Sequence, residues 1–252
     1  LPIMMMSGKV KIFQVIHAIK SGIPVYAAVA PAFVGQFGKE LTPEKLRAAM
    51  KSLGFADVIE VAVGADLCTI EEACDFLKEV PEKQPFMATS CCPAWASMAR
   101  KMFPDLAPYI SMALTPMVLT GRLLKKEHPG CKVVFIGPCA AKKLEASRTE
   151  IRSDVDFVLT FEEVMGMFTA KNIDFSALEK SDDFHDASAD GRGFAASGGV
   201  AQAVVNCIKE LEPDCEVKVA NAEGLAACRE LLSDAAKGKY DGYLLEGMAC
   251  PG

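Results

Sequence analysis

Two adjacent cysteines follow a short apolar run and precede a helix-forming segment, within residues 89–95, Thr-Ser-Cys-Cys-Pro-Ala-Trp. Neighbours such as Cys91 and Cys92 do not readily form a disulfide with each other. The start of a helix stabilises a thiolate, because its free amides and its dipole favour negative charge. The segment therefore indicates a ligand site or a reactive thiol.

Two further cysteines stand after apolar runs that are predicted to be strands. Cys139 follows one such run and a Gly-Pro turn, and Lys142 comes about one helical turn later. Cys250 follows another run near the end of the sequence. Functional groups gather beyond the carboxyl ends of parallel strands, so these two cysteines and Cys92 are expected to converge.

Three interpretations of the cysteines remain open at this stage. Iron–sulfur ligation is favoured over structural zinc, which usually takes Cys-x-x-Cys pairs, because the sequence contains no such pair. A thiol enzyme with Cys91 as nucleophile is a second interpretation, although no His or Asn partner stands near it. The third assigns no special chemistry, since cysteine is often a small buried residue.

The elements that position these residues alternate short β-rich runs with amphipathic segments of helical length. This alternation predicts an α/β fold with mostly parallel, helix-covered sheets. Strands are expected at residues 25–29, 58–62, 86–89, 132–136, 157–160, 216–220 and 242–245. One series of strands and helices runs through about residue 120, and a second begins at about residue 131. We therefore expect one catalytic domain over residues 1–252, with lobes at about 1–125 and 126–252 and the site in the cleft between them.

Helix starts and a long loop can also be predicted locally. Capping signals occur at three places, Thr42-Pro43, Thr69 to Glu72 and Thr160 to Glu163. Residues 176–199 are polar and rich in Asp, Ser and Gly, which predicts a long surface loop.

Composition excludes several classes of protein. The 252 residues are 51% hydrophobic and 24% charged, as expected for a globular domain and not for a disordered chain. The net charge of −6 and the lack of long basic runs make nucleic acid an unexpected partner. No apolar stretch approaches the ~18–20 residues that span a bilayer. Without a secretory signal, the ten cysteines are expected to be free thiols in a cytoplasmic protein.

Three segments resemble the motifs of the catalytic domain of iron-only (FeFe) hydrogenases. The family's first motif, Thr-Ser-Cys-Cys-Pro-x-Trp, is matched in full by residues 89–95. Its second, Met-Pro-Cys-x-x-Lys-x-x-Glu, is matched over residues 137–145 except that Gly137 replaces Met. Its third begins Glu-x-Met-x-Cys and is matched by residues 246–250. Similar residues also occur at 29–31, 64–66 and 197–200.

The resemblance implies reversible formation of dihydrogen at the H-cluster, a 4Fe-4S cubane linked to a di-iron unit with carbonyl, cyanide and bridging dithiolate ligands. The cubane ligands would be Cys92, Cys139 and Cys250, and Cys250 would bridge to the di-iron unit. The family's fourth ligand would fall beyond Gly252, so we expect the C-terminal part of the domain to be missing. The alternatives within the chain are Cys68, Cys74 and Cys131.

The resemblance also implies a route for protons. Cys91 would be the proton donor and acceptor beside the dithiolate amine, because the pKa of a thiol can approach that of the amine. Glu72 resembles the relay carboxylate, Asp75 stands where the family usually has a second Glu, and Ser111 matches the hydroxyl between them. A structural interpretation also fits, with Glu72 as part of a capping box and Asp75 as a solvated position one turn later.

The remaining site residues would surround the cofactor. Lys142 would donate to a bound cyanide, although a lysine can also simply extend along a helix to solvent. The other contacts would come from Ala30, Pro31, Gly137, Pro138 and Met248. Gly137 in place of Met is expected to remove bulk near the bridging carbonyl and to alter the cofactor's potential.

Expected partners are dihydrogen, protons, maturation proteins, and an electron carrier such as ferredoxin or appended iron–sulfur domains. Gly137 and a start close to the catalytic domain are similar to the hydrogen-sensing subgroup. The alternative from another class is an iron–sulfur assembly or scaffold protein of the nuclear-prelamin-recognition-factor-like group, without hydrogenase activity. Cys91 and Lys142 favour the hydrogenase, because holding a cubane requires neither.

Overall fold

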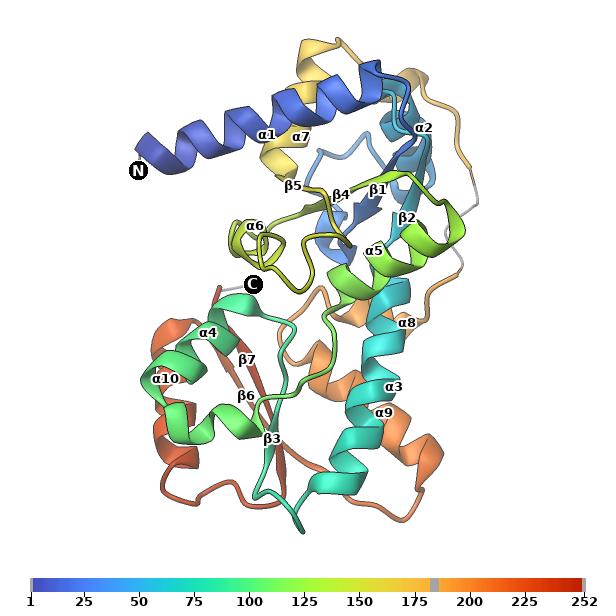
Figure 1. Cartoon of the computed structure of the whole chain (residues 1–252). Helices are drawn as coiled ribbons and strands as arrows, with labels where there is room; N and C mark the ends of the chain where they lie inside the picture. Colours follow the sequence, from blue (N-terminus) through green and yellow to red (C-terminus); the bar gives the residue numbers. More distant parts are fainter. Residues whose placement is uncertain (1, 182–185, 251–252) are drawn as a thin grey trace. The chain divides into compact units, whose positions relative to one another are not determined.

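The computed structural model describes residues 2–181 and 186–250. It contains two compact units, each built from two stretches of chain (Figure 1). Unit 1 comprises Leu1–Gly64 and Met117–Ala187, and unit 2 comprises Ala65–Pro116 and Ser188–Gly252. The chain thus passes repeatedly between the units, which differs from the expected single division near residue 125.

Unit 1 is built on a four-stranded sheet with the order β2-β1-β4-β5, in which every strand pair is parallel. Its strands are β1 (Val25–Val29), β2 (Asp57–Glu60), β4 (Lys132–Gly137) and β5 (Phe157–Thr160). Parallel strands need crossover connections, and helices supply most of them here. The central strands β1 and β4 are almost wholly buried, as a sheet covered on its faces requires.

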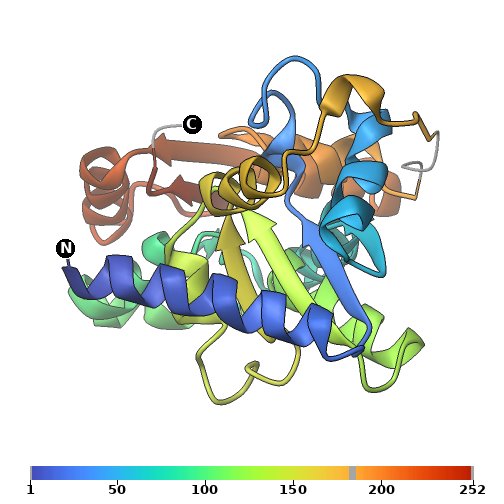
Figure 2. The same ribbon diagram turned by 90° about the horizontal axis from the view of Figure 1, so that it is seen from above.

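The helices of unit 1 are α1 (Pro2–Lys20), α2 (Pro43–Leu53), α5 (Pro116–Glu127), α6 (Ala141–Glu145) and α7 (Phe161–Ala170), with short 3-10 helices η1 (Pro31–Phe33) and η3 (Phe175–Ala177). Helix α1 lies beside β5 (Figure 2). Helix α2 ends at Gly54, whose φ of 106° is left-handed. A Cβ on Gly54 would lie 2.6 Å from the Ile19 side chain, so glycine both ends α2 and admits α1.

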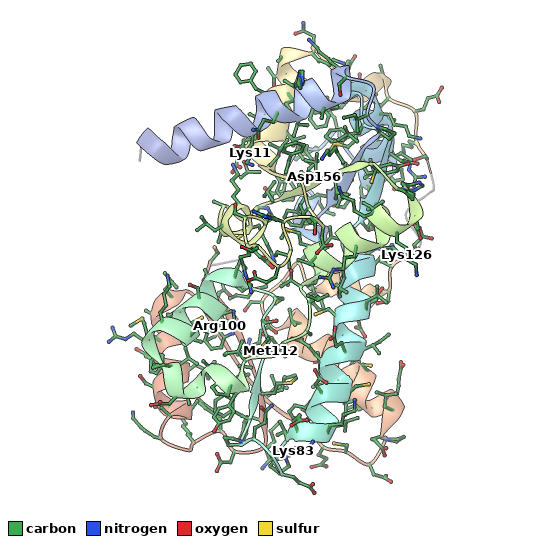
Figure 3. The ribbon with its side chains drawn as sticks, viewed as in Figure 1. Lys11, Lys83, Arg100, Met112, Lys126 and Asp156 are labelled. Atoms are coloured by element: carbon green, nitrogen blue, oxygen red, sulfur yellow. The ribbon has the colours of Figure 1, made fainter. Side chains whose placement is uncertain are left out.

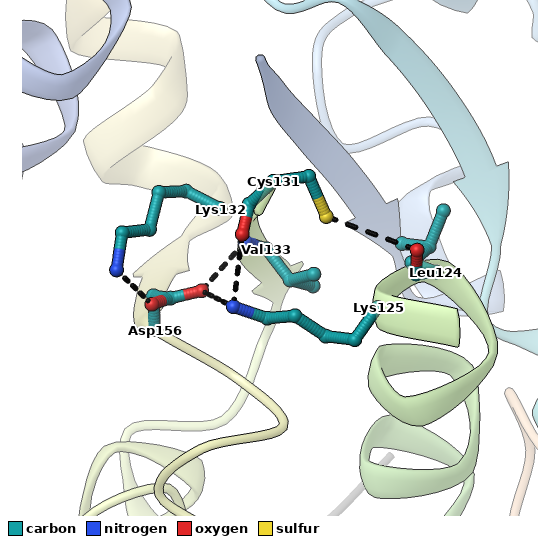
Figure 4. Close-up of polar contacts among 6 residues, drawn as sticks. All are labelled: Leu124, Lys125, Cys131, Lys132, Val133 and Asp156. Atoms are coloured by element: carbon teal, nitrogen blue, oxygen red, sulfur yellow. Dashed lines mark hydrogen bonds and ion pairs between the residues drawn. The ribbon is translucent and has the colours of Figure 1, made fainter. Parts of the chain in front are cut away.

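A carboxylate just before β5 ties three parts of unit 1 together (Figure 4). Asp156 accepts hydrogen bonds from the ammonium groups of Lys125 at 2.6 Å and Lys132 at 2.7 Å, and from the amide of Val133 at 2.9 Å. Burial by itself would raise the pKa of Asp156, but these donors outweigh it and hold the pKa below its usual value. Asp156 thereby joins α5, β4 and β5.

Unit 2 is built on a three-stranded parallel sheet with the order β3-β7-β6. Its strands are β3 (Met87–Ala88), β6 (Lys218–Glu223) and β7 (Tyr243–Met248). Its helices are α3 (Ala62–Glu79), which starts at the end of unit 1, α4 (Pro93–Met102), α8 (Ala189–Gly193), α9 (Gly199–Leu211) and α10 (Leu225–Ala235), with the 3-10 helix η2 (Pro104–Tyr109).

Two apolar cores lie on the two faces of this sheet, because successive side chains of a strand point in opposite directions. Leu245 of β7 belongs to the core that contains Trp95, where α4 and α10 pack. Leu244 belongs to the other core, with Ala73 of α3 and Val204 of α9. This alternation continues along β7 and positions the site residues that follow.

The expected α/β class with parallel sheets is confirmed. The predicted strands 25–29 and 157–160 coincide with β1 and β5, and the others differ by one to a few residues. Residues 176–199 are not one long loop, because they include α8 and the end of η3, while residues 182–185 lie outside the description. No helix among the described residues has the length and apolar character that crossing a membrane requires.

The three predicted helix starts have different outcomes. The capping box of Thr160 and Glu163 is confirmed, with both of its hydrogen bonds formed. Helix α2 starts at Pro43 as predicted, but the Thr42 side chain makes no capping bond. The prediction at Thr69 is wrong. Helix α3 begins at Ala62, so Thr69 lies inside it and donates its hydroxyl to an earlier carbonyl of the same helix.

Candidate functional site

The adjacent cysteines lie between β3 and α4, as the sequence predicts. Cys91 is buried, with 9% of its surface exposed, and the half-buried Cys92 is the N-cap of α4, followed by Pro93. The indole nitrogen of Trp95 donates to the carbonyl of Thr89 at 2.9 Å. The start of the turn that carries both thiols is therefore hydrogen-bonded to the first turn of the helix that follows it.

Glu246 and Met248 of the third motif lie in β7, the central strand of unit 2, and Cys250 follows the strand as an exposed residue. A Cβ on Gly247 would lie 2.2 Å from the Trp95 ring, a separation that real atoms do not adopt. Only glycine therefore allows Trp95 to pack on the strand. Trp95 in this way connects the segment of Cys92 with the segment of Cys250.

Cys228 is a buried thiol beside these segments that sequence reasoning gave no role. Its Sγ lies 3.5 Å from the carbonyls of Ala222 and Met248, which it meets as a weak donor. Burial raises the pKa of Cys228 to about 11, and the neighbouring Cys92 thiol acts in the same direction. Cys228 is therefore a structural thiol that links α10 to the end of β7.

Cys139 stands in unit 1, in the turn between β4 and α6, and is half-buried. Its carbonyl accepts from the amide of Lys142 at 3.3 Å. Lys142 is buried, and its ammonium lies 2.7 Å from the equally buried Glu145 carboxylate. Inside the protein, each of these two side chains is thus the ion-pair partner of the other. The alternative interpretation of Lys142, that it simply extends along a helix to solvent, is therefore wrong.

The ends of β1 and β4 bring several predicted cofactor contacts together in unit 1. The amide of Ala30 donates to the carbonyl of Ile136 at 2.8 Å, which places Ala30 beside Gly137. A Cβ on Gly137 would lie 2.7 and 2.8 Å from ring atoms of Phe135. The missing methionine therefore does not leave all of its volume empty, because the Phe135 ring fills part of the space.

The other predicted contacts surround this region or belong to unit 2. Pro31 begins η1 and is half-buried, whereas Pro138 is exposed. Met248 is half-buried at the end of β7 in unit 2. The convergence of Cys139 with Cys92 and Cys250, and the cleft that would hold them, stay predictions, because Cys139 belongs to the other unit.

Glu72 is the most unusual acid of unit 2. It lies in the middle of α3 with none of its surface exposed, and neither carboxyl oxygen has a hydrogen-bond partner of good geometry. Burial raises its pKa to about 7, against weaker opposing contacts with the Ser111 hydroxyl and the Ser90 backbone. The interpretation of Glu72 as a capping residue at a helix start is therefore wrong.

The Ser111 hydroxyl is the polar group that most opposes the effect of burial on the pKa of Glu72. Ser111 is buried, and its oxygen accepts from the amide of Ala113 at 3.2 Å, which leaves its own proton to be donated elsewhere. The next residue, Met112, is 80% exposed (Figure 3), so this segment reaches the surface within one residue. Asp75 lies one turn beyond Glu72 on α3 and is half-buried.

Glu246 of the third motif is a second wholly buried acid in unit 2, and the sequence marked it only as a motif position. Its two carboxyl oxygens accept from the amides of Gly198 and Ala201, each at 2.8 Å. Burial raises the pKa of Glu246, and these amides oppose that effect. Its place two residues after Leu244 in a strand was the signal that predicts a buried side chain.

The thiol chemistry of the chain fits an iron–sulfur cluster. None of the ten cysteines, which all lie among the described residues and include the three predicted ligands, forms a disulfide bond. Sulfur ligands are those that iron–sulfur clusters take. Among the described residues no group of three or more His, Cys, Asp or Glu is spaced to hold a single metal ion. A cubane spreads its ligands more widely than one ion does, so the cluster assignment stays a prediction.

Comparison with known proteins identifies similar sequences. The family described as "Iron only hydrogenase large subunit, C-terminal domain" matches residues 23–252. Iron hydrogenase 1 of Clostridium pasteurianum is 29% identical over 92% of this chain and 44% of its own length. Nuclear prelamin A recognition factor of Xenopus laevis is 27% identical over 90% of this chain and 62% of its own.

Two further matches differ in extent. The cytosolic Fe-S cluster assembly factor NAR1 of Kluyveromyces lactis is 40% identical over 39% of this chain and 21% of its own length. A solved [FeFe]-hydrogenase, studied for inactivation of its H cluster by oxygen, has the same fold, with a TM-score of 0.78 at 23% identity over 96% of this chain and 82% of that one. The chain spans only 44–62% of the length of the four relatives that are matched over 84–97% of it.

Proposed function

Because this chain belongs to the iron-only hydrogenase family, we propose that it is an enzyme that reversibly combines two protons and two electrons into dihydrogen. The observation that carries the proposal is Glu72, a wholly buried carboxyl with a pKa of about 7 and no cation to neutralise it among its described contacts. Such a group suits proton transfer near neutral pH. A protein that only stores a cubane does not require one.

The chain's own residues would hold the cofactor through three thiols and a lysine. Cys92, Cys139 and Cys250 would bind the cubane, and Lys142 would donate to cyanide while it keeps its salt bridge with Glu145. When bound, the cofactor supplies redox-active iron at which electrons and protons combine. Apolar contacts from Ala30, Pro31, Gly137, Pro138 and Met248 would exclude water.

Protons would travel along unit 2. Ser111 lies one residue from the exposed Met112, and its hydroxyl acts on the Glu72 carboxyl. The backbone of Ser90 also faces Glu72, and Cys91 is the next residue along the chain. Glu72 would hold a proton between the surface and the Cys91 thiol, and that thiol would exchange it with the bound cofactor. Asp75, one turn beyond Glu72 on α3, would assist this proton transfer.

Finer aspects of the role are also part of the proposal. Gly137 and the Phe135 ring beside it support a hydrogen-sensing role, because they change the surroundings that the family's methionine usually gives the cofactor. Electrons would come from a ferredoxin or an appended iron–sulfur domain. Maturation proteins would insert the di-iron unit, and the protein would act in the cytoplasm.

The second candidate is an iron–sulfur assembly or scaffold function without hydrogenase activity. It is supported by the similarity to the assembly factor NAR1 and to nuclear prelamin A recognition factor. In that case Cys92, Cys139 and Cys250 would still bind a cubane. Glu72 and Cys91 would have no proton to move, and their replacement would leave the function unchanged.

The test is anaerobic reconstitution of the protein with iron and sulfide, followed by a synthetic di-iron precursor. We expect infrared bands of metal-bound carbonyl and cyanide, together with hydrogen turnover. Cys91→Ala should keep its iron and lose turnover by about 100-fold or more, because it removes a proton carrier. Cys92→Ala should lose the iron itself. A cubane without carbonyl bands would favour the assembly function, and equal iron loss in both variants would contradict the assigned roles.

A further inference from the structure

Glu246 is a buried acid that the proposed reaction leaves without a role. It lies within β7, and in a strand it points to the same face as Leu244, two residues earlier. Leu244 belongs to the apolar core that α3 and α9 share. An ionisable side chain on that face is costly unless other groups satisfy it, so its surroundings indicate its purpose.

The start of α9 satisfies both oxygens of this carboxyl. Oε1 accepts from the amide of Gly198 and Oε2 from the amide of Ala201, each at 2.8 Å. Helix α9 runs for 13 residues, and the amides at such a start favour a negative charge. These two hydrogen bonds hold the Glu246 carboxyl in one place, with little freedom to turn away.

Residues near Glu72 and Glu246 in the chain share one apolar core. Ala73, the residue after Glu72 on α3, packs in one core with Ala201 and Leu244. The groups that act on the Glu72 carboxyl are Ser111, the backbone of Ser90, Glu246 and Glu71. The first two stabilise the ionised form, and the two acids oppose it. Of the acids, Glu71 is exposed and Glu246 is wholly buried.

We propose that Glu246 is a positioning residue for proton transfer, a carboxyl held by the start of α9 whose negative charge opposes the ionisation of Glu72. Like charges in a poorly solvated site oppose each other's ionisation. Water screens the exposed Glu71, so its influence is smaller. The inference rests on the proposed function only in treating Glu72 as a relay, since the interaction itself exists without any cofactor.

The experiment is an infrared pH titration of the chain without cofactor, which follows the carbonyl band of protonated Glu72. The band is assigned by its loss in Glu72→Gln. In Glu246→Gln, which keeps the shape of the side chain, we expect the titration midpoint of Glu72 to fall by at least about half a pH unit. Glu71→Gln is the matched control and should shift it less. An unchanged midpoint in Glu246→Gln, or an equal shift in both variants, would overturn the proposal.

A second measurement covers the case in which Glu246→Gln does not fold. The interaction between two titrating groups is reciprocal, so Glu72→Gln should lower the titration midpoint of Glu246. Carbon NMR of carboxyl-labelled glutamate reports it, and α9 keeps its anchor in this variant. An unchanged Glu246 midpoint would overturn the proposal. Neither titration needs hydrogen turnover, so a chain that shows the coupling but no turnover would refute the proposed function alone.

Discussion

Two acidic side chains, one in each unit, are shielded from water, and their pKa values are shifted in opposite directions. Asp156 of unit 1 accepts from two lysine ammonium groups and one amide (Figure 4), and its pKa is lowered. Glu72 of unit 2 is wholly buried, has another acid as neighbour, and its pKa is raised to about 7. Burial alone raises the pKa of both, so the partners decide the outcome.

The difference separates a structural acid from one suited to chemistry. Asp156 joins two strands and a helix through its ionised carboxylate. This structural role requires that Asp156 remains deprotonated near neutral pH. Glu72 is held where its charged form is disfavoured, and it contributes no ion pair to the fold. Its burial is therefore not explained by a contribution to stability. The three predictions below test this contrast, and their expected effects decrease in size.

The largest effect is expected on hydrogen turnover in the loaded protein. Glu72→Gln should lower turnover by about 10²–10⁴-fold, or about 3–5 kcal/mol of activation free energy, because the amide carries no proton between Ser111 and Cys91. Asp156→Asn, compared per folded chain, should change turnover only slightly. The measurement is hydrogen evolution with a chemical reductant. Equal losses in the two variants would remove the distinction between the acids.

The next effect is on the pH dependence of stability. Glu72 has a pKa of about 7 in the folded protein and a usual value of 4.5, so the folded state binds its proton more firmly. Its contribution is full below pH 4.5 and is lost as pH rises through 7. Glu72→Gln avoids this loss and should be more stable than the parent by about 3 kcal/mol above neutral pH.

Urea unfolding of the parent and of Glu72→Gln, at a series of pH values, measures this difference. The gap between the two should be small in mild acid and grow toward alkaline pH, where the parent must ionise a buried group. A constant gap across the series would mean that Glu72 is already ionised in the folded protein.

The smallest effect is the loss of stability on replacing the structural acid. Asp156→Asn should lower the free energy of unfolding by about 1–2 kcal/mol at neutral pH, because two ammonium groups lose their charged acceptor. The lysines are 25% and 39% exposed, which limits the loss through screening by water. Because the pKa of Asp156 is lowered, its contribution is present above the usual value of 3.8 and is lost as pH falls further.

Thermal or urea unfolding of Asp156→Asn at neutral and acidic pH provides the check. The variant should approach the parent as the solution becomes acidic enough to protonate Asp156. If the variant instead equalled the parent at neutral pH, Asp156 would contribute nothing net, and the contrast with Glu72 would rest on Glu72 alone.

Local sequence signals predicted much of the fold, and their failures have one cause. Thr160 and Glu163 form the predicted capping box because the strand β5 ends at Thr160 and α7 begins at the next residue. Thr69 and Glu72 have the same spacing, yet α3 had already begun at Ala62. A capping signal covers only a few residues, so it does not show whether a helix has already begun upstream.

The division of the chain into two units depends on contacts between distant residues, which local sequence patterns do not predict. Strand β1 pairs with β4, about a hundred residues away, and β7 pairs with both β3 and β6. A division of the chain near residue 125 follows the order of elements, whereas the structure divides it by which strands share a sheet. Sequence order and spatial order differ wherever crossovers are long.

The sequence by itself determined the α/β class, the positions of Cys91, Cys92 and Cys139 at strand ends, and the family, because strand periodicity and motif spacing are written in neighbouring residues. Only the tertiary structure decided the pKa values of the buried acids and the requirement for glycine at position 247. The pKa of Glu72 depends on burial and on Glu246, which lies far away in the chain. Gly247 is required because Trp95, from another element, occupies the space of a side chain. Electrostatic energy and close packing depend on distances in space, which spacing along the chain does not give.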